Sequence, residues 1–119
     1  MTAGPPRAED RQTIEFPQRQ IGHTGLQVTE LGLGCATLGG SQIAVARAAA
    51  EEIVAAAWAA GVRYVDTAPY YGVGQAERCI EDALRDRPRG EWVLSTKVGR
   101  LLHRNPTVAF AGSAGRFRP

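Results

Sequence analysis

Three short apolar segments recur at nearly constant spacing, and this repeat constrains the fold more than any other feature of the sequence. The segments begin at Leu31, Val62 and Glu91, and stretches of helical period separate them. A connection between parallel strands must contain a crossover, usually a helix, so that one strand and one helix together take about 30 residues. The repeat therefore predicts an α/β fold with three parallel strands.

Glycine and proline set the expected limits of the helices. The first helix is expected to run through Ala44 to Ala60, with Ser41 as its N-cap and Gly61 as its left-handed C-terminal residue. The second helix is expected over residues 75–86, because apolar residues recur there at helical spacing and a proline follows. The third strand is then expected over residues 91–96.

The two ends of the chain lack this periodicity. Residues 1–18 carry prolines and scattered charges and predict a flexible leader, whereas residues 103–119 contain no acidic residue and predict a disordered tail. Residues 19–102 form the ordered unit between them. That unit is expected to begin with a β-hairpin over residues 19–28, because its turn, residues 22–25, has a glycine at each end.

Composition excludes several classes of partner. The net charge of +2 is too small to predict nucleic-acid binding. The longest apolar run, residues 53–62, is shorter than the roughly 18 to 20 residues that cross a bilayer, and residues 1–16 lack the apolar segment of a secretory signal. Cys35 and Cys79 do not make a disulfide framework. We therefore expect a cytoplasmic protein with no nucleic-acid or membrane partner.

Chemically distinctive side chains stand where the expected strands end. The second strand ends at Asp66 and is followed by Tyr70 and Tyr71, and the third ends at Lys97. Lys97 is the only lysine among 14 basic residues, the others being arginine, which indicates a place where an amine is required. Parallel strand–helix units carry their functional groups at this end of the sheet.

A carboxylate, a phenol and an amine on one rim are suited to proton transfer. Free tyrosine, with a pKa near 10, is a weak acid at neutral pH, and a neighbouring ammonium favours its phenolate form. A carboxylate beside the amine keeps that amine charged. The alternative is that Asp66 and Lys97 form an ion pair that serves structure alone, and the spacing leaves both interpretations open.

The loop after the first strand, residues 32–37, is rich in glycine and allows a ligand to approach the backbone closely. Cys35 in this loop is a candidate nucleophile, but burial as a small apolar residue is the favoured interpretation, as it is for Cys79. The glycines at 72 and 74 lack the third glycine of a dinucleotide fingerprint, because Glu77 occupies its place. No spacing of metal ligands occurs, so no metal is predicted.

Several separate segments resemble the aldo-keto reductases, which are (β/α)₈ TIM barrels that use NAD(P)H. The similar segments occur in the family's order between about Arg19 and Leu102: residues 19–22, 26–28, 31–34, 66–72 with Glu77, and 95–99. Residues 34–40 and 69–72 are most similar to the aldose and pyridoxal dehydrogenase branch. The resemblance implies that residues 19–102 are the truncated N-terminal part of such a barrel, with only its first three strands.

The resemblance also implies roles for individual residues. Asp66, Tyr71 and Lys97 take three of the family's four catalytic roles, with Tyr71 as the acid or base and Tyr70 as a pocket wall. The fourth member, a histidine after the next strand, is missing, and His103 stands too close to Lys97 to replace it.

The same resemblance implies a place for the cofactor. Gly34, Cys35, Ala36 and Thr37, together with Asp66, are expected at the nicotinamide end of NAD(P)(H).

The expected activity is NAD(P)-dependent hydride transfer to or from a small-molecule carbonyl or sugar. Oxidation of an aldose or pyridoxal-like hemiacetal to a lactone is the specific form that the resemblance implies. A three-stranded piece of a barrel leaves a strand edge unpaired, so we expect the isolated chain to self-associate there and to be inactive. The alternative is a non-catalytic product of a truncated or frame-shifted gene, or a module that another chain completes.

Overall fold

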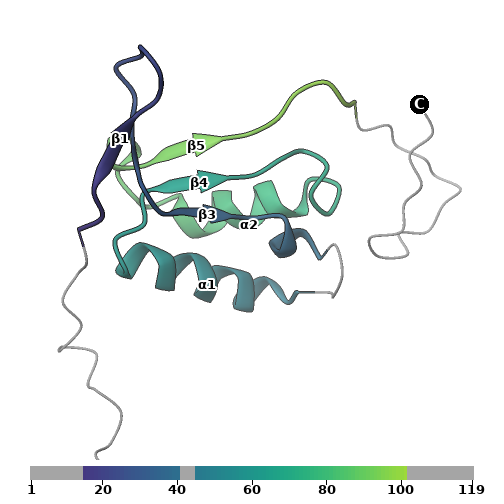
Figure 1. Cartoon of the computed structure of the whole chain (residues 1–119). Coiled ribbons are helices and arrows are strands. Elements are labelled where there is room, and N and C mark those ends of the chain that lie inside the picture. Colours follow the sequence, from purple (N-terminus) through teal and green to yellow (C-terminus); the bar gives the residue numbers. More distant parts are fainter. Residues whose placement is uncertain (1–14, 41–44, 102–119) are drawn as a thin grey trace, which may run out of the picture.

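The structure, a computed structural model, describes residues 15–40 and 45–101 and contains a hairpin followed by a parallel sheet (Figure 1). The elements in chain order are β1 (Gln18–Gln20), β2 (Gln27–Thr29), β3 (Gly32–Gly34), the 3₁₀ helix η2 (Thr37–Gly39), α1 (Arg47–Ala59), β4 (Tyr64–Asp66), α2 (Gln75–Leu84), the 3₁₀ helix η3 (Arg89–Glu91) and β5 (Val93–Ser95). Strands β1 and β2 pair antiparallel, and β3, β4 and β5 form a parallel sheet in that order. The predicted hairpin and the three predicted parallel strands are confirmed.

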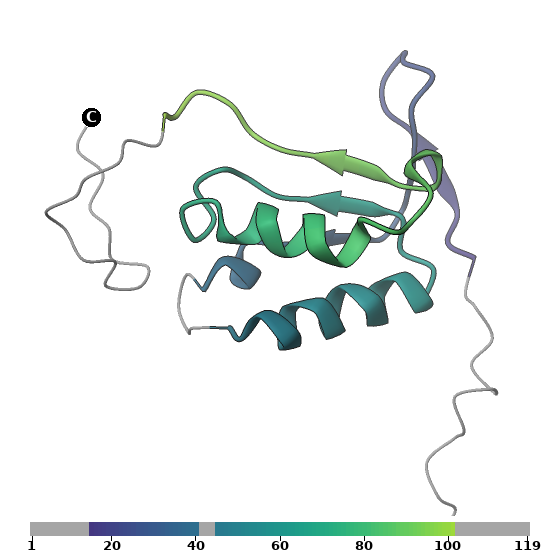
Figure 2. The same cartoon turned by 180° about the vertical axis from the view of Figure 1, so that it is seen from behind.

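Both helices lie on one face of the parallel sheet. Helices α1 and α2 pack against each other, and Figure 2 shows α2 in front of the strands with α1 below it. The other face of the sheet carries no helix in the described part of the chain (Figure 1). Because side chains alternate between faces along a strand, Val65 points to the helices, whereas Tyr64 and Asp66 share the uncovered face.

The core between sheet and helices is made of small and medium apolar side chains. In α2 the buried residues Ala76, Cys79, Ile80 and Leu84 recur at helical spacing and form one stripe. They pack with Leu38, Ala50, Val54, Val65 and Cys35, and the half-buried Trp58 and Trp92 complete the cluster. Burial of this stripe is the main contribution that holds α2 to the sheet.

The ends of α1 show one confirmed expectation and one wrong one. Gly61 has φ of 97°, its N–H donates to the Trp58 carbonyl, and the Val62 N–H donates to the Ala57 carbonyl, so the predicted glycine cap is confirmed. The expected helical start at Ala44 is wrong, because Ala46 has extended backbone and α1 begins at Arg47. Ser41, the expected cap, lies outside the described residues, and none of the described side chains caps the N-terminus of α1.

Helix α2 and the third strand are shorter than expected. Helix α2 ends at Leu84 rather than Asp86, and η3 occupies the start of the segment that was expected to be a strand. The predicted tail, residues 103–119, and residues 1–14 of the predicted leader lie outside the described residues, so the flexible leader and the disordered tail stay predictions. Within the described ranges no helix is both long and apolar enough to span a bilayer.

The buried Thr29 side chain links the hairpin to the sheet. The Thr29 hydroxyl donates to the Leu31 carbonyl over 2.8 Å and accepts the Arg63 N–H over 3.2 Å. Thr29 is only 5% exposed, so both hydrogen bonds are shielded from water. The two sheets share no backbone ladder in the described residues, and this hydroxyl therefore spans the gap between them.

Candidate active site

The register of the parallel sheet brings the expected functional strand ends together. Asp66 ends the central strand β4 and lies between Gly34 of β3 and Ser95 of β5. Lys97 follows Ser95 by two residues and therefore emerges on the same rim. The carboxylate and the amine that the sequence placed at neighbouring strand ends thus meet on the uncovered face of the sheet.

Asp66 and Lys97 form a direct ion pair. The Lys97 Nζ donates to Asp66 Oδ2 over 2.8 Å and to the Thr67 carbonyl over 2.9 Å. The Ser95 hydroxyl donates to the other carboxylate oxygen, Oδ1, over 2.5 Å. Lys97, and to a lesser degree Ser95, lowers the pKa of Asp66, and Asp66 in turn raises the pKa of Lys97. Both groups therefore stay charged at neutral pH.

Tyr71 is the tyrosine that lies beside the lysine. The Lys97 Nζ lies 5.0 Å from the centroid of the Tyr71 ring, whereas the ring of Tyr70 has the Arg100 guanidinium 5.3 Å away. Tyr71 also packs against the hydrophobic core, which holds its ring in place. The structure thus brings together the three residues expected to be catalytic, and the acid or base role of Tyr71 stays a prediction.

Two glycines hold the loop that carries Tyr71. Gly72 has φ of 60°, and a Cβ added to it would lie 1.9 Å from the Gly39 carbonyl oxygen. A Cβ on Gly39 would lie 2.4 Å from the Tyr71 carbonyl carbon. The η2 turn and the loop after β4 therefore touch backbone to backbone, an approach that only glycine permits. This contact fixes the position of Tyr71 relative to β3.

The residues expected to bind the cofactor are divided between surface and core. Gly34 and Thr37 are exposed, Ala36 is half-buried, and a Cβ on Gly34 would meet nothing within 4 Å. Cys35 is 0% exposed, and burial raises the pKa of its thiol to about 11. The packing interpretation of Cys35 is confirmed, as it is for the buried Cys79. The surface that the loop offers to a ligand lies over Gly34 and Thr37.

Sequence reasoning missed the hydroxyl groups that contact the ion pair. The Tyr64 hydroxyl lies 3.2 Å from Ser95 Oγ, and Ser95 contacts Asp66 as described above. Nearby, the Thr96 hydroxyl donates to Glu77 of α2 over 2.8 Å. Tyr64 stands two residues before Asp66, and Ser95 stands two residues before Lys97, a spacing that places each pair on one face of an extended strand. This spacing was the sign in the sequence that Tyr64 and Ser95 lie on the same face as the ion pair.

No histidine completes the site in the described part of the chain. Its one described histidine, His23, lies in the turn of the hairpin, which Figure 1 shows at the opposite end of the sheet from the rim. His103 lies outside the described residues. Across residues 15–40 and 45–101, no three histidine, cysteine or acidic side chains gather as metal ligands would.

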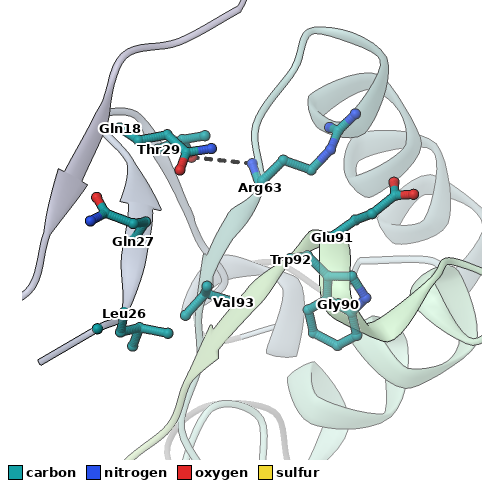
Figure 3. A pocket seen from close by; sticks show the side chains of 10 residues that line it. Gln18, Leu26, Gln27, Thr29, Arg63, Gly90, Glu91, Trp92 and Val93 are labelled. Carbon is teal, nitrogen blue, oxygen red and sulfur yellow. Dashed lines mark hydrogen bonds between the residues drawn. The ribbon is translucent and has the colours of Figure 1, made fainter.

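A cavity of about 270 Å³ lies elsewhere, between the hairpin and the starts of β4 and β5 (Figure 3). Leu26 and Gln27 line it from the hairpin, and Arg63, Trp92 and Val93 line it from the sheet. These residues stand at the amino ends of the strands, whereas Asp66 and Ser95 stand at the carboxyl ends. The cavity is therefore separate from the candidate site.

Comparisons with known proteins agree with this arrangement. The family model described as "Aldo/keto reductase family" matches residues 30–118. A pyridoxal 4-dehydrogenase of Microbacterium luteolum is 51% identical over 85 residues, which are 71% of this chain and 25% of that protein. A D-threo-aldose 1-dehydrogenase of a Pseudomonas species is 46% identical over 82 residues, which are 69% of this chain and 25% of that protein.

A solved structure shows a similar arrangement. An aldo-keto reductase of Bacillus halodurans in its holo form superposes with a TM-score of 0.66 at 35% identity, over 75% of this chain and 28% of that chain. The expected fold, three strands of a (β/α)₈ barrel, is thereby confirmed, and the described residues form an open sheet rather than a closed barrel. The chain spans about a quarter of the length of the two curated relatives.

Proposed function

Because this chain belongs to the aldo/keto reductase family, we propose that its rim residues form the proton-transfer part of an NAD(P)-dependent oxidoreductase site. The observation that carries the proposal is the Asp66–Lys97 ion pair with Tyr71 beside it. A purely structural ion pair does not require a tyrosine next to the ammonium. The proposed substrate is a hemiacetal of an aldose or of a pyridoxal-like aldehyde, which the names of the two relatives support.

Each of the three side chains has a separate role in the transfer of one proton. When substrate is oxidised, Tyr71 accepts the proton of the substrate hydroxyl, and when a carbonyl is reduced it returns that proton to the carbonyl oxygen. The Lys97 ammonium stabilises the negative charge on the tyrosine oxygen. Asp66 keeps Lys97 charged and directs it, because its carboxylate binds one ammonium hydrogen and the Thr67 carbonyl binds another.

The loop beside the ion pair suits the nicotinamide end of the cofactor. Gly34 leaves open space directly beside Asp66 in the sheet, and the exposed Thr37 follows on the next turn. Gly34, Ala36 and Thr37 would hold the ring there with Asp66. When bound, NAD(P) supplies the hydride chemistry at the substrate carbon.

The chain alone is expected to turn over little substrate, because the described residues bring no histidine to the rim. The direct test incubates the purified chain with NAD⁺ or NADP⁺ and a panel of aldoses and pyridoxal. A chimera then places residues 30–101 in the corresponding region of the Microbacterium luteolum relative, which supplies the rest of the barrel. We expect background rates from the chain and clear dehydrogenase activity from the chimera.

Matched tyrosine variants of the chimera test the assignment of Tyr71. Tyr71→Phe removes the proton donor and is expected to lower kcat by about 10²–10⁴-fold, the usual contribution of a positioned acid or base. Tyr70→Phe makes the same chemical change away from Lys97 and is expected to have a far smaller effect. A folded chimera in which Tyr71→Phe keeps full activity contradicts the proposal.

A second role is association through the free edge of the sheet. The outer edge of β5 pairs with no strand in the described residues, and exposed apolar side chains occur in β5 and in the segment that follows it. Leu94 is 37% exposed, Val98 99% and Leu101 79%. An unpaired edge with apolar side chains is a template for pairing with another chain. Self-association is therefore proposed, with sedimentation velocity as the test: Val98→Glu should lower the association, whereas Val73→Glu, on the loop before α2, should not.

A further inference from the structure

The hydroxyl contacts on the uncovered face of the sheet form a continuous chain that ends at the ion pair. The Tyr64 hydroxyl lies 3.2 Å from Ser95 Oγ, Ser95 Oγ lies 2.5 Å from Asp66 Oδ1, and Asp66 Oδ2 lies 2.8 Å from Lys97 Nζ. The two oxygens of the carboxylate thus have different partners. One is bound by a hydroxyl and the other by the ammonium.

The number of hydrogens available fixes the direction of this chain. An ionised carboxylate only accepts, so Ser95 must use its single hydroxyl hydrogen for Asp66. Ser95 can then only accept from Tyr64, and the Tyr64 phenol is the donor. A short bond between a hydroxyl and a carboxylate is strengthened when the hydroxyl itself accepts a hydrogen bond, because each bond polarises the next.

Gly32 provides the space that Tyr64 needs to reach Ser95. A Cβ on Gly32 would lie 2.7 Å from Cδ1 and 3.3 Å from Cε1 of the Tyr64 ring. One edge of the ring therefore lies against the bare backbone of Gly32, and its hydroxyl reaches Ser95 of β5. The sequence pattern predicts that the glycine-rich loop from Gly32 allows a ligand to approach. In the structure the ring of Tyr64 occupies the space beside the Gly32 backbone.

We propose that Tyr64 is a positioning residue that acts through Ser95 to hold the Asp66 carboxylate in the orientation that presents Oδ2 to Lys97. In this chain of hydrogen bonds, Tyr64 bonds to Ser95 and not directly to Lys97 or Tyr71. Its importance for catalysis rests on the function proposed above. Its effect on the carboxylate is measurable without turnover, so the two proposals can fail separately.

The measurement is the titration of Asp66 followed by ¹³C NMR of its carboxyl carbon in the full 119-residue chain. Within residues 15–40 and 45–101, the titratable groups linked to Asp66 are Lys97 and Tyr71 on the rim, Tyr64 on β4 through Ser95, and the Cys35 thiol on the loop after β3. In the range where a carboxyl titrates, Lys97 and Cys35 both stay protonated, because the ordinary pKa values of an ammonium and a thiol lie far above that range and the fold raises both pKa values further. The midpoint therefore reports the partners of the carboxylate.

The expected order of midpoints follows from the chain. Ser95→Ala removes the donor to Asp66 and is expected to raise the midpoint most. Tyr64→Phe removes only the hydroxyl that polarises Ser95, so it is expected to raise the midpoint by a smaller but resolved amount. Tyr70→Phe, the matched control, is expected to leave the midpoint unchanged, and Ser95→Thr, which keeps the hydroxyl, is expected to restore it.

Two outcomes overturn the proposal. One is a midpoint in a natively folded Tyr64→Phe chain that equals that of the parent. The other is an equal rise in Tyr64→Phe and Tyr70→Phe, since that result reports a general loss of structure rather than the hydroxyl chain. Gly32→Ala supplies a second perturbation that keeps the phenol but displaces its ring, and it is expected to shift the midpoint in the same direction as Tyr64→Phe.

Discussion

The glycine contact beside the site predicts a stability effect that three alanine variants can separate. At Gly72 an alanine is disfavoured for two reasons. The first is backbone strain, because φ is 60°, and the second is a steric clash, because the new Cβ would lie 1.9 Å from the Gly39 carbonyl oxygen. At Gly74 it meets only the first, because φ is 86° and nothing lies within 4 Å. At Gly39 it meets only the second, because the Cβ would lie 2.4 Å from the Tyr71 backbone.

The expected magnitudes follow from these geometries. A residue with a Cβ in the left-handed region loses about 1–2 kcal/mol, which is the effect expected for Gly74→Ala. Overpacking costs typically about 1–3 kcal/mol, which is the effect expected for Gly39→Ala. Gly72→Ala combines both, about 2–5 kcal/mol, because the loops must also separate until a distance of 1.9 Å becomes at least 3.0 Å. The smaller conformational freedom of alanine in the unfolded chain is common to all three variants and cancels in the comparison.

Urea unfolding followed by tryptophan fluorescence measures these differences, since Trp58 and Trp92 are half-buried against the core. The double variant Gly39→Ala/Gly72→Ala adds a further check. Separating the two loops once relieves both contacts, so its loss of stability is expected to be smaller than the sum of the single losses. Equal unfolding free energies for Gly72→Ala and Gly74→Ala would refute the backbone contact.

Three further predictions concern the core and the titrating groups. Ile80→Ala, in the buried stripe of α2, is expected to lower the unfolding free energy by about 2–5 kcal/mol, and the 44% exposed Ile53→Ala by much less; urea unfolding compares them. Folding lowers the pKa of Asp66, so its stabilisation is present above the ordinary aspartate pKa near 4 and is lost as pH falls through the folded value. Folding raises the pKa of Lys97, so the stabilisation that Lys97 contributes is lost only as pH rises above about 10.4. Asp66→Asn is expected to remove both the acidic and the alkaline pH dependence from the unfolding free energy, measured as a function of pH. Cys35, buried and with its thiol pKa raised to about 11, is expected to react with a thiol reagent only after unfolding, and rapid native labelling would contradict its burial.

Local sequence patterns were sufficient to predict the strands, the hairpin and the proximity of Asp66 to Lys97. The period of about 30 residues and the glycine at 61 act over short stretches of chain, so the sequence itself carries them. The start of α1 was misplaced because Ala44 and Ala46 continue the alanine-rich composition of the helix itself, and alanine favours helix without marking an end. Extended backbone at Ala46 stops the helix there, and no residue type indicates that conformation.

The hydroxyl chain was missed for a different reason. It depends on which residue of β4 lies opposite which residue of β5, and short parallel strands carry no local mark of their register. Once Asp66 pairs with Ser95, the alternation of side chains places Tyr64 on the same face. The burial of Cys35 was the favoured interpretation, but only the packing of α2 against the sheet shows that its thiol lies in the core.

The hydrogen bonds of the Thr29 hydroxyl to the Leu31 carbonyl and the Arg63 N–H determine how the hairpin and the sheet unfold locally. Because the described residues join the hairpin to the parallel sheet through the Thr29 hydroxyl and not through a ladder of backbone bonds, the two are expected to be separate cooperative units. The amides of β1 and β2 are then expected to exchange with solvent through local detachment, which requires less free energy than unfolding the sheet. The central strand β4, bonded on both sides, is expected to exchange only when the whole sheet opens.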